Sequence, residues 1–205
     1  MRSHAARFAA MAIIGLAAGA AARAEEGDSA PREKPEASQA PAPKSSAEIR
    51  AELYDRLAAA KDEDETQGLI RLLFAAYSDS GSDTGDLLLE RARKAMSAKD
   101  FDAAGKILDA AVAFLPNWAE SWNARATLRW LDDDYDGSMA DIAETLKREP
   151  RHIGALSGMA MILTARDKKE EALRVYERIL SIAPHWKSAE EAADKLRTAV
   201  KGQEL

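Results

Sequence analysis

The sequence predicts an all-α fold in which antiparallel helix hairpins stack as a helical-repeat solenoid. Three prolines, Pro116, Pro150 and Pro184, stand 34 residues apart, and each ends a stretch with helical periodicity. Small and large residues recur in separate columns of the same 34-residue period. A fixed period of this length is typical of stacked helical units.

The chain begins with the pattern of a secretory signal peptide. Arg2 and Arg7 make the start basic, residues 8–22 are apolar apart from two glycines, and A-R-A ends at Ala24. We predict cleavage after Ala24, so that 1–24 is a signal peptide, and export, most simply to the periplasm. An uncleaved N-terminal anchor is the alternative, although the apolar run is short for a membrane span. The sequence has no cysteine, which excludes a lipid-modified N-terminus and disulfides.

Residues 25–45 are predicted to be a disordered spacer. They hold four of the seven prolines, no aromatic residue and no apolar period, so they cannot bury enough surface to offset chain entropy. A polyproline docking motif is the alternative reading of this segment. Without 1–24, which carries three arginines and no acid, the chain has 26 basic and 35 acidic residues, a net charge of −9. Such acidity disfavours nucleic acid and anionic membranes as partners. We expect neither a nucleic-acid partner nor stable membrane insertion.

Residues 46–84 are predicted to form a degenerate helical hairpin that caps the first repeat. Two apolar stripes at helical spacing support it: Ile49, Leu53 and Leu57, then Leu69, Leu73 and Tyr77. The stretch D-S-G-S-D-T-G-D at 79–86 is predicted to be a turn, with Asp83 or Thr84 capping the next helix.

Three repeats are predicted at 85–118, 119–152 and 153–186. Their helices are expected at 86–97, 101–114, 118–131, 135–148, 152–165 and 169–181. Positions 8 and 20 of every copy are small, as a close approach of two helices requires: Ala92, Ala126, Ala160, Ala104, Ser138 and Ala172. The turns K-D-F, D-D-Y and D-K-K each offer an Asp to cap the second helix. Residues 187–201 are predicted to be a C-terminal capping helix with one apolar side.

The middle copy reads W-N-A-R-A…D-D-Y-D-G-S-M-A-D-I-A-E-T-L-K-R-E-P, and the third contains K-K-E-E-A-L-R-V-Y-E-R-I-L-S-I-A-P. On these residues the chain resembles the tetratricopeptide repeat (TPR) family over 85–186. The sequence departs from the family at position 17 of the third copy, where Lys169 replaces an aromatic residue. The resemblance implies a right-handed solenoid whose first helices line a concave groove that binds another protein or peptide.

The family's groove positions give the candidate partner-binding residues. We select Leu89, Arg93, Met96, Asn123, Thr127, Trp130, Leu131, Met161 and Thr164. Trp130 has two interpretations that stay open: an exposed binding anchor, or a side chain packed under the C-terminal helix. The carboxylate clamp of chaperone-binding members is absent, because its five positions hold Leu89, Arg93, Ala124, Gly154 and Gly158.

No set of residues points to catalysis, a cofactor or a metal ion. His152 and His185 fall in corners between repeats, without a second His at ligand spacing, and we interpret them as surface turn histidines. The acidic turn at 132–136 fits no calcium loop, and neither a nucleophile elbow nor a phosphate loop is present. The sequence therefore predicts a non-catalytic periplasmic adaptor that binds an extended peptide or helix in its groove. The alternatives are a structural accessory subunit of an envelope assembly and a chaperone-like factor for an exported client, as in cytochrome c maturation.

Overall fold

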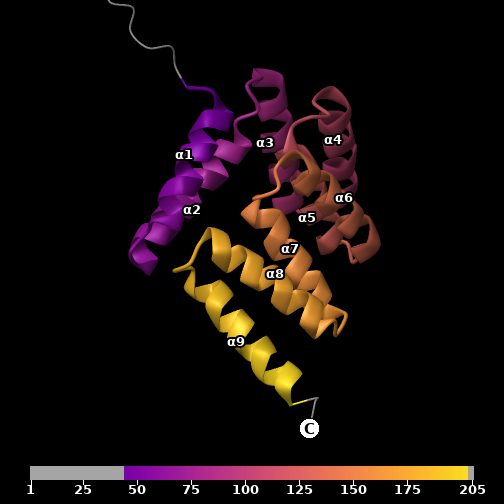
Figure 1. The fold of residues 1–205 in the computed structure, drawn as a ribbon. Helices are drawn as coiled ribbons and strands as arrows, with labels where there is room; N and C mark the ends of the chain where they lie inside the picture. The colour runs from indigo at the N-terminus through magenta and orange to yellow at the C-terminus, as the bar shows by residue number, and fades with distance from the viewer. Residues whose placement is uncertain (1–43, 203–205) are drawn as a thin grey trace, which may run out of the picture. The chain divides into compact units, whose positions relative to one another are not determined.

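The computed structural model describes residues 44–202. The predicted signal peptide 1–24 and nearly all of the predicted spacer 25–45 lie outside the described residues. Within 44–202 the chain forms nine α-helices and no strand, as Figure 1 shows. The helices are α1 Ser46–Ala58, α2 Glu63–Ser78, α3 Asp83–Ser97, α4 Phe101–Phe114, α5 Ala119–Leu131, α6 Tyr135–Arg148, α7 Ile153–Ala165, α8 Lys169–Ile182 and α9 Lys187–Lys201. The predicted all-α fold of stacked hairpins is confirmed.

None of the helices described is long and apolar enough to cross a membrane. The helices α4, α6 and α8 end at Phe114, Arg148 and Ile182. Each end lies two residues before one of the periodic prolines, Pro116, Pro150 and Pro184. A proline disfavours helical angles in the residue before it, which explains why these three helices end in the same register.

The turn inside each repeat has the same backbone conformation. Lys99, Asp133 and Asp167 stand at equivalent positions and are left-handed, with φ of 59°, 60° and 57°. The next residue in each turn donates its backbone N–H to the carbonyl five residues earlier, at 2.9, 2.8 and 2.9 Å. This pattern is a Schellman closure of α3, α5 and α7. The left-handed position is usually filled by glycine, yet no glycine occupies it in this chain.

The N-caps of the second helices differ between repeats. Asp100 accepts the Ala103 N–H at 3.1 Å and Asp134 accepts the Gly137 N–H at 2.9 Å. In the third turn Lys168 occupies the N-cap position and its side chain makes no capping bond. The Asp predicted to cap there stands one residue earlier, in the left-handed position, so that prediction is wrong. Before α3 the cap is Ser82, rather than Asp83 or Thr84.

The small residues at positions 8 and 20 lie where the two helices of each hairpin meet. All six are at most 3 % exposed: Ala92 and Ala104, Ala126 and Ser138, Ala160 and Ala172. The hydroxyl of Ser138 donates to the carbonyl of Ala126 at 2.8 Å. The polar member of this set is therefore satisfied inside the contact.

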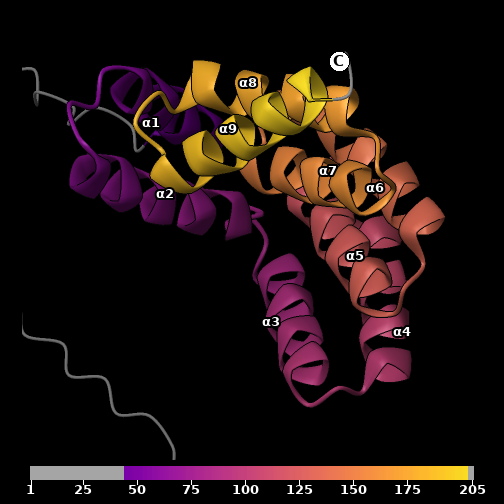
Figure 2. The same ribbon diagram turned by 90° about the horizontal axis from the view of Figure 1, so that it is seen from below.

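The N-terminal hairpin, α1 and α2, packs mainly on the last repeat rather than on the first. Its apolar stripes share one buried cluster with residues of α7, α8 and α9: Ile153, Leu156, Ile179, Ile182, Ala183 and Ala189. At the start of α9 the Lys187 N–H donates to Glu63 of α2 at 2.8 Å. Figure 2 shows α1 and α2 beside α8 and α9.

The prediction that the N-terminal hairpin caps the first repeat is therefore wrong, because this hairpin packs mainly on the last repeat. In α3 the buried residues Leu89 and Ala92 pack on Ala104 and Leu108 of α4. The corner where α7, α8 and α9 meet supplies a broad apolar surface that the stripes of α1 and α2 cover. The hairpin therefore packs on the last repeat rather than on the first, since burial of apolar area is the main force that drives packing.

Candidate partner-binding groove

A pocket of about 220 Å³ lies between α5 and α7. Four of the nine predicted groove residues line it: Asn123, Thr127, Trp130 and Met161. The rest of its wall is formed by Ala126, Ser138, Ile142, Gly154, Ser157 and Gly158. Because two glycines face the pocket from α7, the space beside Trp130 and Met161 stays open.

The volume of this pocket suits one side chain. A cavity of about 150 Å³ holds a benzene molecule, and pockets for drug-sized ligands begin at about 300 Å³. The pocket between α5 and α7 falls between these sizes. It is therefore large enough for an aromatic or long aliphatic side chain and small for a cofactor.

Trp130 lies at the groove. It is partly buried against Ala126, Ile142 and Ile162 and borders the pocket. The buried residue Leu196 of α9 belongs to a different apolar cluster, with Leu163 and Ala172. Trp130 is thus partly buried on α5, α6 and α7, and part of its side chain borders the pocket, so neither interpretation holds in full.

The other predicted groove residues have different environments. Leu89 is 1 % exposed and packs between α3 and α4, so its selection as a contact residue is wrong. Met96 is partly buried against the same cluster. Leu131 and Thr164 are exposed but stand outside the pocket wall. Leu89 is buried because it stands on the face of α3 that packs on α4.

Arg93 is engaged in a buried polar network centred on Glu120. The Glu120 side chain is 4 % exposed and its Oε1 accepts from Arg93 Nη2 at 2.7 Å. Its Oε2 accepts from Asn123 Nδ2 at 3.0 Å and meets His152 Nε2 at 3.1 Å. A buried carboxylate is tolerated when donors surround it in this way. Since the donors come from α3, α5 and the corner before α7, Glu120 connects the first repeat to both ends of the second.

His152 is fully buried, so its interpretation as a surface histidine is wrong. Its Nδ1 accepts the Ala155 N–H at 3.2 Å, which caps α7. The ring proton therefore sits on Nε2, which donates to Glu120. The imidazole stacks on Tyr77 of α2 with ring centroids 3.9 Å apart and planes at 15°. The N-terminal hairpin covers this corner and removes it from solvent, whereas His185 stays exposed.

An aromatic residue ends each repeat, and all three take part in the junction with the N-terminal hairpin. Trp118 Nε1 donates to the Tyr77 carbonyl at 2.9 Å, His152 stacks on Tyr77, and Trp186 packs on the apolar cluster that α1 and α2 share with the last repeat and α9. Sequence reasoning missed this set, which we call the position-34 aromatics. The signal was present, because Trp, His and Trp recur at the last position of the period.

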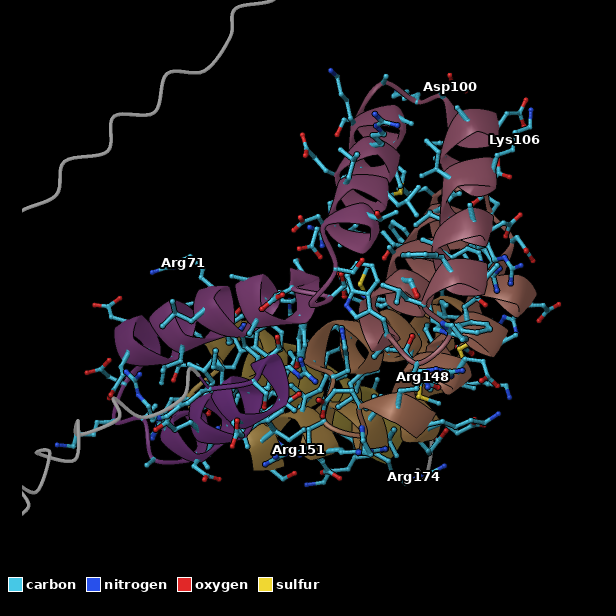
Figure 3. The ribbon with its side chains drawn as sticks, turned by 90° about the horizontal axis from the view of Figure 1, so that it is seen from above. Arg71, Asp100, Lys106, Arg148, Arg151 and Arg174 are labelled. Atoms are coloured by element: carbon cyan, nitrogen blue, oxygen red, sulfur yellow. The ribbon has the colours of Figure 1, made fainter. Side chains whose placement is uncertain are left out.

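Two tyrosines of the hairpin complete this junction. The hydroxyls of Tyr54 and Tyr77 lie 2.6 Å apart, and the Ile153 N–H donates to Tyr77 Oη at 3.3 Å. Burial raises the pKa of both phenols above their ordinary value. The guanidinium of Arg151 stands 4.0 Å above the Tyr54 ring, and Figure 3 shows this arginine beside α1. These groups fix the hairpin to the corners of the repeats.

A second buried charge cluster is structural. Arg125 of α5 makes two hydrogen bonds to Asp141 of α6, at 2.9 and 2.8 Å, and one to Asp109 of α4 at 2.8 Å. The hydrogen bonds that Arg125 donates to Asp141 are the main cause of its raised pKa. Across the described residues no group of three or more His, Asp or Glu side chains could hold a metal ion.

Comparison with known proteins identifies a relative and a fold. No family model matches the sequence. A TPR repeat-containing protein of Rhizobium etli is 40% identical over 151 residues, which cover 74% of this chain and 74% of that protein.

Solved structures with this fold are TPR domains. The first TPR of Spaghetti (RPAP3), bound to the HSP90 peptide SRMEEVD, has a TM-score of 0.55 at 21% identity and covers 58% of this chain and 95% of that one. The TPR domain of Arabidopsis OM64 has a TM-score of 0.54 at 16% identity, with coverages of 57% and 97%. The Sgt2 TPR domain from Aspergillus fumigatus has a TM-score of 0.55 at 14% identity, with coverages of 60% and 83%. At these identities the likeness shows the fold alone.

Proposed function

Because this chain belongs to the family of TPR repeat-containing proteins, we propose that it is a non-catalytic adaptor that binds an extended peptide or a helix of a partner protein. The partner lies in the groove along α5 and α7. The observation that carries this proposal is the pocket between these helices, where Trp130 and Met161 border space for one side chain. Tryptophan residues in well-packed pockets are typical anchors of protein interfaces.

The location of the adaptor is part of the proposal. The basic start, the apolar run and Ala24 support export to the periplasm with cleavage after Ala24. Cell fractionation followed by mass spectrometry of the mature N-terminus tests this. A periplasmic chain that starts at Glu25 is the expected result, and a cytoplasmic chain that keeps Met1 would contradict it.

Affinity capture with matched variants tests the groove. Trp130→Ala combined with Met161→Ala removes the apolar wall, and Gly158→Leu fills the pocket without removing any contact. The first carbon of a side chain at 158 would lie 3.4 Å from Ile142 Cδ1, close to ordinary contact. Phe114→Ala is the control, since Phe114 is an exposed aromatic side chain at the end of α4, away from the pocket.

The wild-type chain and the Phe114→Ala control are expected to retain the same partner from a periplasmic extract, and both groove variants are expected to lose it. Circular dichroism must show equal helicity for all four proteins. If the groove variants retain the partner, it binds another face, as a structural accessory subunit would do.

A further inference from the structure

Phe74 of the N-terminal hairpin lies against Gly154, one of the residues that line the partner-binding pocket. This side chain of α2 is 38 % exposed, and its Cε1 would lie 3.1 Å from a Cβ added at Gly154. Gly154 lines the pocket where α7 begins. A larger residue at 154 would push against Phe74, so glycine allows α2 to approach the α7 backbone here.

The contacts of the last turn of α2 hold Phe74 in place. Its ring meets Tyr77 edge-on, with centroids 5.9 Å apart and planes at 86°, and Tyr77 in turn stacks on His152. In the same turn Ser78 Oγ accepts from Arg93 Nη2 at 3.0 Å. Phe74 therefore stands on a part of the hairpin that is fixed to both α3 and the start of α7.

The chemistry of the pocket wall defines the group that fits. Its polar side chains, from Asn123, Thr127, Ser138 and Ser157, are all uncharged. The nearby cation Arg93 already pairs with Glu120. A charged ligand group would lose water here without gaining a counter-charge, which is unfavourable.

We propose that Phe74 is a specificity-determining residue of this pocket, and that the anchor of the partner is a single aromatic or large aliphatic side chain on an uncharged, extended segment. Phe74 contacts the end of that side chain and limits its size. The inference rests on the proposed function and extends it, because it makes the N-terminal hairpin a part of the binding site.

Panning of a random peptide library displayed on phage against the purified full chain tests the proposal. Phe74→Ala opens the end of the pocket, and Phe74→Leu keeps an apolar contact of smaller size. Leu72→Ala is the matched control, since Leu72 is 51 % exposed on the same helix but lines a separate hollow with Ile49 of α1. Trp130→Ala removes part of the pocket wall and tests whether the peptides bind in the pocket at all.

The wild-type chain and the Leu72→Ala control are expected to enrich the same peptides, with one large apolar residue among uncharged ones. Trp130→Ala is expected to lower their affinity about tenfold or more. Phe74→Ala is expected to shift the preferred anchor to a larger side chain, with Phe74→Leu between it and the wild type. Thermal melting must show that each variant is folded.

Three results would overturn the inference. If Trp130→Ala loses binding while both Phe74 variants select the same peptides as the wild type, the hairpin is outside the site and the proposed function stands. If peptides with acidic C-termini are enriched, the chemistry of the anchor is wrong. If none of the variants changes the selected peptides, the groove proposal fails as well.

Discussion

The contacts within the repeats and the contacts between the repeats and the N-terminal hairpin use different kinds of residue. Within a repeat the helices meet through small side chains, such as Ala92 and Ala104, that recur with the period. At the hairpin junction, large aliphatic residues of α1, α2, α7 and α8 share one buried cluster, and aromatic stacking and buried hydrogen bonds add to it. One of these bonds, from the Ile153 N–H to Tyr77 Oη, joins residues 76 apart in sequence. The contacts within a repeat recur along the chain, whereas the junction combines an apolar cluster with polar bonds that join the hairpin to the corners of the repeats.

This difference predicts two kinds of response to mutation. An apolar contact responds to a change of volume, and its neighbours share the strain. A buried polar network fails when one member is removed, because the groups left behind have neither partner nor water. The predictions below separate the two, from the largest expected effect to the smallest.

Glu120→Ala is expected to be the most damaging change. It leaves the buried His152 and the Asn123 amide without their acceptor, and we expect a loss of about 3 kcal/mol of unfolding free energy. Urea denaturation followed by circular dichroism measures it. Glu191→Ala on the exposed side of α9 is the control, with an expected change within about 0.5 kcal/mol. A loss below about 1 kcal/mol for Glu120→Ala would show that the network does not stabilise the junction.

Ala160→Leu is expected to disturb one repeat by overpacking. The residue is fully buried between α7 and α8, and the added carbons should lower the unfolding free energy by about 2 kcal/mol. The same substitution at Ala113, an exposed alanine of α4, provides the control in the same urea titration. Equal stability of both variants would contradict the close contact at position 8.

Alkaline pH is expected to weaken the junction through Tyr54 and Tyr77. Burial raises the pKa of both phenols, so the folded state keeps its protons to a higher pH than the unfolded state. Their contribution to stability is complete below pH of about 10 and is lost above it. For one such phenol the loss is about 1.4 kcal/mol per pH unit.

Unfolding free energies of the wild type and the Tyr54→Phe, Tyr77→Phe double variant, measured from pH 8 to 11, test this. The wild type should lose more stability than the variant above pH 10. Parallel curves would mean that these phenols ionise as freely in the folded state as in the unfolded state.

Lys168→Asp is expected to stabilise the third repeat. The first two repeats have an Asp cap at this position and the third has Lys168 with no capping bond, so a new cap should add about 1 kcal/mol. The reverse experiment, Asp134→Ala in the second repeat, should remove about 1 kcal/mol. Differential scanning calorimetry would show the two melting temperatures moving in opposite directions.

Lys99→Gly is expected to give the smallest gain. The left-handed backbone of Lys99 costs roughly 1–2 kcal/mol for an ordinary side chain, and the flexibility of glycine in the unfolded chain offsets part of this. A net gain of about 0.5 kcal/mol remains. Asp133→Gly should gain less, since Asp tolerates this conformation better. Chemical denaturation that finds Lys99→Gly less stable than the wild type would contradict the strain argument.

Much of the repeat architecture follows from the sequence alone. The helices predicted at 101–114 and 135–148 have those bounds in the structure, because side-chain spacing, turn residues and prolines act over a few residues. The groove positions of α5 and α7 came from the resemblance to the TPR family, carried over onto the regular period. Four of these residues line the pocket beside Trp130.

The third turn shows the limit of local reasoning. D-K-K offers an Asp, but the Schellman turn places Asp167 in the left-handed position and leaves Lys168 at the cap. The left-handed position and the N-cap position are one residue apart in the turn. The residue composition of the turn does not specify which residue takes which position.

The sequence by itself determined the hairpins and their period, since these depend on spacings within one repeat, while the groove positions followed from the family resemblance. The tertiary structure decided where the N-terminal hairpin docks, why His152 is buried and why Phe74 lies against Gly154. Those outcomes depend on which apolar and polar surfaces remain uncovered after the repeats stack. The apolar stripes of α1 and α2 and the position-34 aromatics are each visible in the sequence, but their pairing spans most of the described chain and is set by mutual burial.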